Sequence, residues 1–195
     1  GLIIQLGEWV LRRACEQQVR WREVGLASLQ IAVNMSSRQF RQDDLASKVA
    51  QIILDTGIDP ARLTLELTES MVMQDLNSTL ATLRSLKNLG VSISLDDFGT
   101  GYSSLSYLRR FPIDELKIDK SFINDIHTNP DDAAIASAVI AMSLSLGLDV
   151  VAEGIENAEQ AAQLRDMKCH QGQGYYFSRP VDAEQFAAFV RRQEG

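Results

Sequence analysis

The feature that most constrains the fold is the regular alternation of strand-like and helix-like segments along the chain. Apolar residues at every second position mark strands, and apolar residues at every third or fourth position mark amphipathic helices. The pattern predicts strands over residues 29–34, 63–67, 91–96, 115–119, 149–153 and 173–177. Because strands that alternate with helices form parallel βα units, we expect an α/β fold.

The side-chain pattern within the strands separates the two main α/β architectures, an open doubly wound sheet and a closed (βα)8 barrel. In the first four predicted strands the apolar residues share one parity, and small or polar residues occupy the other, as in the segment Leu63–Leu67. An open sheet covered by helices on both faces would carry apolar residues on both. No G-x-G-x-x-G motif follows the first predicted strand, which weakens a dinucleotide-binding interpretation. The pattern therefore favours a barrel with a polar lining.

Charge and composition exclude several function classes. The net charge of −7 argues against binding to long nucleic acid, which needs clustered Lys and Arg. No apolar stretch is long enough to cross a bilayer, so we expect no membrane segment in this chain and a cytoplasmic location. The two cysteines, Cys15 and Cys169, lie far apart in no metal-binding spacing, and we expect both to be reduced thiols in or near the core.

Polar side chains gather at the carboxyl ends of the predicted strands, where barrel enzymes place their chemistry. They are Asn34, Glu66, Asp96, Asp97, Lys117 and Glu153. Carboxylates that converge repel one another and lose hydration, so they need a counter-charge. Lys117 supplies one positive charge, and Mg2+ or Mn2+ would supply more, since carboxylate and amide oxygens suit these ions. The adjacent pair Asp96-Asp97 suits a two-metal site for phosphodiester hydrolysis.

Other interpretations of the same residues are weaker. Lys117 is a candidate Schiff-base lysine of an aldolase-like barrel, but the carboxylates around it would keep it charged. His127 and His170, the only histidines, lie in no metal-ligand spacing, which disfavours zinc. We interpret both as loop or surface residues.

Six segments together resemble the EAL domain family of bacterial phosphodiesterases, which hydrolyse cyclic di-GMP to linear pGpG. They are Val33-Asn34-Met35-Ser36, Leu65-Glu66-Leu67-Thr68-Glu69-Ser70, Asp96-Asp97-Phe98-Gly99-Thr100-Gly101-Tyr102-Ser103-Ser104-Leu105, Leu116-Lys117-Ile118-Asp119, Val151-Ala152-Glu153-Gly154-Ile155-Glu156 and Gln173-Gly174-Tyr175. The resemblance covers essentially the whole chain, and it implies a modified TIM (βα)8 barrel.

The resemblance also implies a role for each matching residue. Asn34, Glu66 and Asp96 resemble ligands of a first Mg2+ or Mn2+ ion, and Asp96 resembles the ligand shared with a second ion held by Asp97 and Glu153. Lys117 and Glu153 resemble the catalytic pair, with Lys117 orienting the water and Glu153 having general-base character. Gln173 and Glu156 belong to the same site. Glu69 resembles the anchor of the loop Phe98 to Ser106, which implies a homodimer interface near that loop.

The Glu-x-Leu motif that names the family is absent, together with its metal-ligating glutamate. The resemblance implies that this motif and the first two strands lie upstream, so we expect residues 1–195 to be an EAL phosphodiesterase domain with about six of the eight strands. Sensory or GGDEF domains further upstream and a membrane-tethered parent are compatible with this view. We expect the chain alone to show little or no hydrolysis. The alternative is a non-catalytic receptor or scaffold for cyclic di-GMP.

Overall fold

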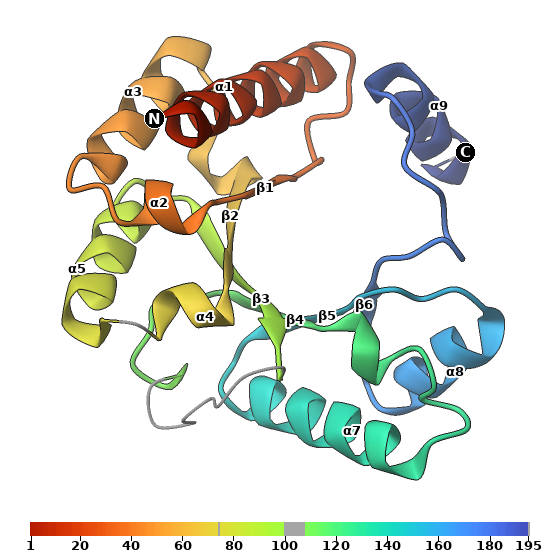
Figure 1. The fold of residues 1–195 in the computed structure, drawn as a ribbon. Coiled ribbons are helices and arrows are strands. Elements are labelled where there is room, and N and C mark those ends of the chain that lie inside the picture. Colours follow the sequence, from red (N-terminus) through yellow and green to blue (C-terminus); the bar gives the residue numbers. More distant parts are fainter. Residues whose placement is uncertain (74, 100–107, 195) are drawn as a thin grey trace. The chain divides into compact units, whose positions relative to one another are not determined.

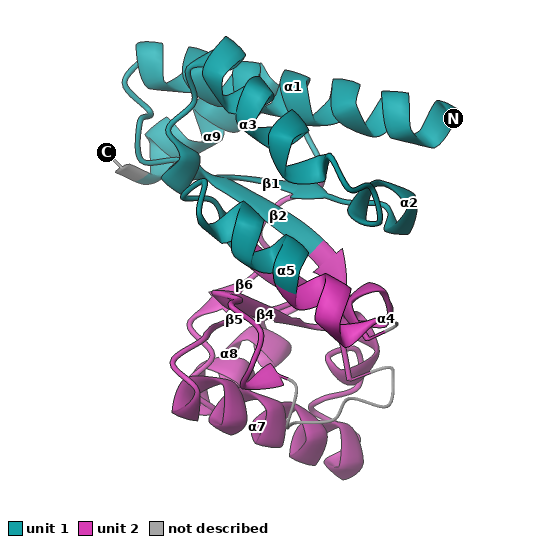
Figure 2. Ribbon diagram, turned by 90° about the vertical axis from the view of Figure 1, so that its left-hand side faces the viewer, with its two compact units in different colours: residues 1–66, 81–92, 180–195 teal, residues 67–80, 93–179 magenta. Residues whose placement is uncertain are grey.

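In the computed structural model, residues 1–73, 75–99 and 108–194 are described. They form two compact units (Figure 2). Unit 1 comprises residues 1–66, 81–92 and 180–195, and unit 2 comprises residues 67–80 and 93–179. The chain crosses between the units inside strand β2 and inside helix α5, so neither unit is a continuous stretch of sequence.

Six strands occur in the described residues, and they follow one another in chain order in the sheet (Figure 1). They are β1 (Ile31–Asn34), β2 (Leu63–Thr68), β3 (Ser92–Phe98), β4 (Glu115–Ile118), β5 (Asp149–Ala152) and β6 (Gln171–Gly172). The pairing is parallel between β1 and β2, and again along β3, β4, β5 and β6. The expectation of a parallel α/β fold is confirmed.

Helices connect the strands. They are α1 (Leu2–Glu23), α2 (Ser37–Phe40), α3 (Leu45–Thr56), α4 (Glu69–Val72), α5 (Leu76–Lys87), α7 (Pro130–Ser145), α8 (Ala158–Asp166) and α9 (Ala183–Glu194), with short 3-10 turns η1 (Pro60–Arg62) and η2 (Lys120–Phe122). Local side-chain hydrogen bonds mark where two of the helices begin. Asn157 forms a capping box at the start of α8, and Asn129 caps α7 ahead of Pro130. Helix α3 ends at Gly57, which has a left-handed backbone conformation.

Unit 1 packs α1 against α3 and β1. Leu11 and Cys15 of α1 are buried there, and Cys15 is a free thiol without any exposed surface. Helix α9 meets the end of α1, where the rings of Trp21 and Phe186 lie 5.2 Å apart and the Trp21 indole N–H donates to the Ala183 carbonyl.

Unit 2 packs α7 against β4 and β5. Its core is made of the apolar strand residues together with helix residues such as Ile140. Ile93, Leu95, Leu116 and Ile118 are fully buried, as their parity predicts.

The small and polar strand residues that alternate with the apolar ones are also largely buried. On an ordinary sheet surface that faces solvent, such residues would be exposed. Ser94, Lys117 and Asp96 in unit 2 are less than a tenth exposed, and so are Thr64 and Glu66 of β2. Buried polar groups need partners, and Ser94 donates to the Glu115 carboxylate at 2.7 Å. This burial agrees with the predicted polar lining.

The sixth strand lies earlier than predicted. It covers Gln171–Gly172, whereas residues 173–177 were expected. After Gly174 the chain turns, because the Phe177 N–H donates to the Gly174 carbonyl and the Tyr176 N–H donates to the Ile155 carbonyl. The aromatic run that suggested a strand is therefore a turn with exposed side chains.

The remaining sequence expectations concern thiols, histidines and membrane spans. Cys15 and Cys169 are both buried and unpaired with each other, as expected. His127 and His170 are exposed. Within the described residues, no helix combines the length and the apolar character that a membrane span requires.

Candidate active site

The centre of the candidate site is an irregularity in strand β3. The β3–β4 register pairs Leu95 with Leu116 and then Phe98 with Ile118, so that Asp96 and Asp97 together face the single residue Lys117. This is a β-bulge, and Asp97 has a positive φ of 56°, a conformation rare for a residue with a side chain. In a regular strand two neighbouring side chains would point to opposite faces. The bulge instead brings both aspartates to one place.

The two aspartates meet a third carboxylate that follows β5. Ligand oxygens of Asp96, Asp97 and Glu153 lie within 4.8 Å of one another. Lys117, which is 4% exposed, places its ammonium nitrogen 2.6 Å from Oε1 of Glu153 and 3.5 Å from Oδ1 of Asp96. The cluster therefore combines three carboxylates with one buried cation.

The excess of carboxylates over positive charge in this cluster favours binding of a metal ion. Burial raises the pKa of Asp97, and the negative charges of Asp96 and Asp119 raise it further, while Lys117 and Lys120 lower it less. Asp97 is thus held as a carboxylate less easily than an ordinary aspartate, because burial and the neighbouring negative charges outweigh the two lysines. A divalent cation with oxygen ligands would offset these negative charges, so the donor set fits Mg2+ or Mn2+.

The Glu153 carboxylate is fixed by its neighbours. Gln173 donates to Oε1 of Glu153 at 2.5 Å, and the backbone of Gln173 bonds to Ala152 and Ile155, which flank Glu153 and Gly154. Gly154 has a φ of 73°, and a Cβ there would lie 2.6 Å from Cβ of Lys120. Glycine is needed at this position because the chain turns sharply directly after Glu153 and lies close against η2.

Two other predicted ligands, Asn34 and Glu66, lie in unit 1. They are paired residues in the β1–β2 register, so they stand side by side, with Asn34 at the end of β1 and Glu66 two residues before the end of β2. Glu66 is 8% exposed and Asn34 is exposed. The structure thus brings Asn34 to Glu66, and separately brings Asp96, Asp97, Lys117, Glu153 and Gln173 together in unit 2.

Glu69 and Glu156 have separate surroundings. The buried Glu69 carboxylate accepts a hydrogen bond from the Gly99 N–H at 3.0 Å, at the start of the segment that the resemblance has it anchor. Most of that segment, residues 100–106, lies outside the described residues, and so does the predicted dimer contact. Glu156 is exposed and is not a member of the carboxylate cluster. Its backbone N–H donates to Oε1 of Gln160.

Sequence reasoning missed Gln160, a buried glutamine whose amide bonds to two different loops beside the site. A signal was present, because Asn157-x-x-Gln160 has the spacing of a capping box immediately after the Glu153–Glu156 segment.

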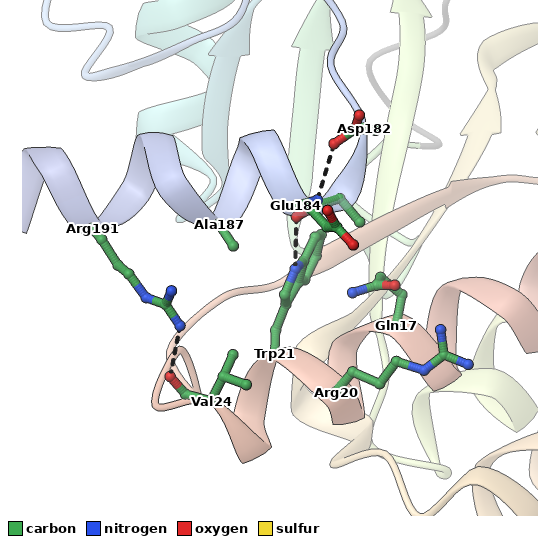
Figure 3. A pocket seen from close by; sticks show the side chains of 9 residues that line it. Gln17, Arg20, Trp21, Val24, Asp182, Glu184, Ala187 and Arg191 are labelled. Carbon is green, nitrogen blue, oxygen red and sulfur yellow. Dashed lines mark hydrogen bonds between the residues drawn. The ribbon is translucent and has the colours of Figure 1, made fainter.

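A pocket of about 700 Å3 lies between α1 and α9 in unit 1 and contains none of the predicted site residues (Figure 3). Trp21 forms one wall, Asp182 accepts hydrogen bonds from the first N–H groups of α9, and Arg191 donates to the Val24 carbonyl. The hydrogen bonds of Asp182 and Arg191 are thus made to backbone groups at the ends of α9 and α1. We therefore take the carboxylate cluster, and not this pocket, as the candidate site.

Comparison with known proteins shows the family to which the chain belongs. A family model described as "EAL domain" matches residues 1–180. The signaling protein YkoW of Bacillus subtilis (strain 168) is 48% identical over 99% of this chain, and the bifunctional diguanylate cyclase/cyclic di-GMP phosphodiesterase MucR of Pseudomonas aeruginosa is 47% identical over 97% of it. The chain spans 24% and 28% of the lengths of these two relatives, or about a quarter.

Solved structures give the same result. A PaMucR phosphodiesterase in a c-di-GMP complex superposes with a TM-score of 0.92 at 47% identity, covering 95% of this chain and 75% of the other. A manganese/cy-diGMP complex of Klebsiella pneumoniae BlrP1 has a TM-score of 0.82 at 30% identity, covering 91% of this chain and 45% of the other. The fold is an incomplete TIM-barrel-like α/β fold, as the parity of the strands and the resemblance indicated. The chain belongs to the EAL domain family.

Proposed function

We propose that this chain carries the catalytic residues of a metal-dependent phosphodiesterase that hydrolyses cyclic di-GMP to linear pGpG. The observation that carries the proposal is the cluster of Asp96, Asp97 and Glu153 around the buried ammonium of Lys117. The name of MucR and the cyclic di-GMP complexes of PaMucR and BlrP1 support this substrate.

In the proposed reaction, a water oxygen forms a bond to one phosphorus of the cyclic dinucleotide and the bond from that phosphorus to the ribose O3′ breaks. The water loses a proton and the leaving O3′ gains one, which leaves a 5′-phosphate and a 3′-hydroxyl. Glu153 is placed to accept the proton, because Lys117 and Gln173 fix its carboxylate through charge-assisted and neutral hydrogen bonds. Lys117 is also placed to orient the water and to stabilise negative charge on the phosphoryl oxygens.

Asp96, Asp97 and Glu153 would hold Mg2+ or Mn2+ through carboxylate oxygens, and the resemblance adds Asn34 and Glu66 as ligands. Such ions, when bound, supply a more acidic water and neutralise charge on the phosphate. Gln173 and Glu156 are proposed to lie near the substrate.

The test is hydrolysis of cyclic di-GMP by the full-length protein in Mn2+, followed by chromatography of the products. We expect pGpG as the product of wild type and none from Asp96→Asn. The control is Asp125→Asn, an exposed aspartate in unit 2 outside the cluster, which should hydrolyse normally.

Binding of cyclic di-GMP without any turnover by the wild type would overturn the proposal and favour the receptor alternative. Equal turnover by wild type and Asp96→Asn would show that the chemistry takes place elsewhere.

A further inference from the structure

The proposed water-activating pair is assembled where two neighbouring, paired strands of unit 2 lead into separate loops. Lys117 is near the end of β4 and leads into η2, while Glu153 follows β5 and leads into α8. The backbone joins the two loops directly at one point, where the Glu153 N–H donates to the Ile118 carbonyl at 3.2 Å. The β4–β5 pairing holds the strand ends, and beyond it contacts between the loops support the 2.6 Å contact between Lys117 and Glu153.

Gln160 of α8 makes such a contact. Its Oε1 accepts hydrogen bonds from the N–H groups of Glu156 at 2.7 Å and Asn157 at 3.2 Å, which end the Glu153 loop. Its Nε2 donates to the Asn124 carbonyl at 2.9 Å, two residues after η2 in the Lys117 loop. One side chain therefore bonds to both loops.

A helix-capping role alone does not account for these bonds. In a capping box the third helical residue accepts a bond from the N-cap N–H, and glutamate serves there as well as glutamine. Only an amide can also donate to a carbonyl, and the Gln160 side chain uses this donor on the other loop. Gln160 is 3% exposed, so a replacement that cannot donate would break a part-buried bond and leave the Asn124 carbonyl without this partner.

We propose that Gln160 is a positioning residue for the Lys117–Glu153 pair, which holds the loop after β5 against the loop after β4. The expected fall in kcat rests on the proposed phosphodiesterase function. The expected effect on the two loops rests on the hydrogen bonds alone. Loss of the Asn124 bond should let the two loops move apart and misplace Glu153 relative to Lys117.

The central variant is Gln160→Glu, tested in the full-length protein. A glutamate keeps the shape and the oxygen that accepts from the Glu156 and Asn157 N–H groups, but it places its other carboxylate oxygen against the Asn124 carbonyl. We expect kcat for cyclic di-GMP in Mn2+ to fall by about 10- to 100-fold, the scale of a misplacement of about 1 Å. KM should change less than about twofold, because a side chain that is 3% exposed has little surface to offer a substrate.

Two further variants separate positioning from charge and from stability. Gln163→Glu is the matched control: its amide donates to the Ile126 carbonyl at 2.9 Å from the same helix, but it does not bond to the Glu153 loop. It adds the same charge and should keep kcat within about twofold of wild type, as expected for a group away from the pair. Gln160→Met removes all three side-chain hydrogen bonds without adding charge, and it should lower kcat at least as much as Gln160→Glu.

Amide hydrogen exchange gives a readout that is independent of activity. Gln160→Glu should speed exchange in residues 118–126 and leave the start of α8 protected, whereas Gln160→Met should speed exchange in both. If Gln160→Glu does not fold, the comparison of Gln160→Met with Gln163→Glu decides the question.

Wild-type kcat and unchanged exchange in both Gln160 variants would overturn the inference. So would an equal loss of kcat in Gln163→Glu, because a general weakening of α8 would then explain the effect. A wild-type protein that does not hydrolyse cyclic di-GMP, with exchange changed as described, would refute the proposed function but keep the structural role of Gln160.

Discussion

Removal of the Lys117 ammonium tests the electrostatic design of the cluster most directly. Coulomb's law with an effective dielectric constant of about 20 gives a gross attraction of about 6 kcal/mol for the 2.6 Å contact with Glu153 and about 5 kcal/mol for the 3.5 Å contact with Asp96. Most of this offsets the hydration that the three buried groups lose. Because Lys117→Ala would leave the carboxylates without their internal cation, we expect it to lower the free energy of unfolding by about 3–5 kcal/mol without divalent metal.

The assay is urea denaturation of wild type and Lys117→Ala, each in chelator and in Mn2+. The destabilisation should be smaller in Mn2+, because a bound cation replaces part of the lost charge. Turnover of cyclic di-GMP should fall by about 10²- to 10⁴-fold in Lys117→Ala, the range of acid–base and electrostatic contributions. The control Lys120→Ala removes an exposed lysine that also lowers the pKa of Asp97 but keeps the Cβ against Gly154. It should leave both quantities close to wild type.

The reasoning would be refuted if Lys117→Ala had the stability of wild type in chelator. Near-normal turnover in that variant would refute the assigned role of Lys117 in the reaction. An effect of the same size in Lys120→Ala would show that long-range charge, not the contact with Glu153, matters.

Three further predictions concern the metal, the base and a buried thiol. Mg2+ or Mn2+ should support hydrolysis in the full-length protein. Ca2+ should inhibit it, because the longer bonds and looser geometry of Ca2+ misplace the water. Full activity in excess chelator would contradict this prediction. Glu153→Gln should keep binding of cyclic di-GMP, measured by calorimetry, but lower turnover by about 10²- to 10⁴-fold; unchanged turnover would exclude Glu153 as the base. Burial raises the pKa of Cys15 from 9.0 to about 11, so its stabilising contribution is complete below pH 9 and is lost as the pH rises toward 11. Denaturation of wild type and Cys15→Ala between pH 7 and 11 measures this, and a difference that does not shrink above pH 9 would contradict it.

The sequence was sufficient to predict the fold class because strand burial follows a period of two. Leu63, Leu65 and Ile93 are fully buried, as their parity indicates. The sixth strand was misplaced because Tyr175–Phe177 has strand-forming residues but is not part of the β5–β6 pairing, which joins Gln171 and Gly172 to β5. The close approach of Gly172 and Gly174 to Ile155 instead sets where the pairing ends, and this is a tertiary contact that local pattern does not reveal.

The sequence indicated which residue types form the site better than it indicated which residues bond to one another. Acidic residues and a lysine at strand ends indicate a charged site, and the cluster of Asp96, Asp97 and Glu153 agrees with that prediction. The bonds of Gln160 to two loops were not predictable, because Asn124 is 36 residues away in sequence. The metal-ligand roles of Asn34 and Glu66 stay predictions.

The bulge in β3 explains both why the cluster exists and why strand parity alone could not place it. Parity assigns Asp96 to the polar face and Asp97 to the opposite one, where the helices pack and a carboxylate would be buried without a partner. The positive φ of Asp97 changes the direction of its side chain relative to the sheet. The Asp97 N–H then donates to Oδ1 of Asp96 at 3.0 Å. A left-handed conformation at a non-glycine residue costs about 1–3 kcal/mol, and it persists only where the surroundings enforce it. Here the Glu69 carboxylate holds the Gly99 N–H two residues later, which fixes the end of the bulge. The strained backbone is thus the physical means by which two consecutive aspartates become neighbours in one carboxylate cluster.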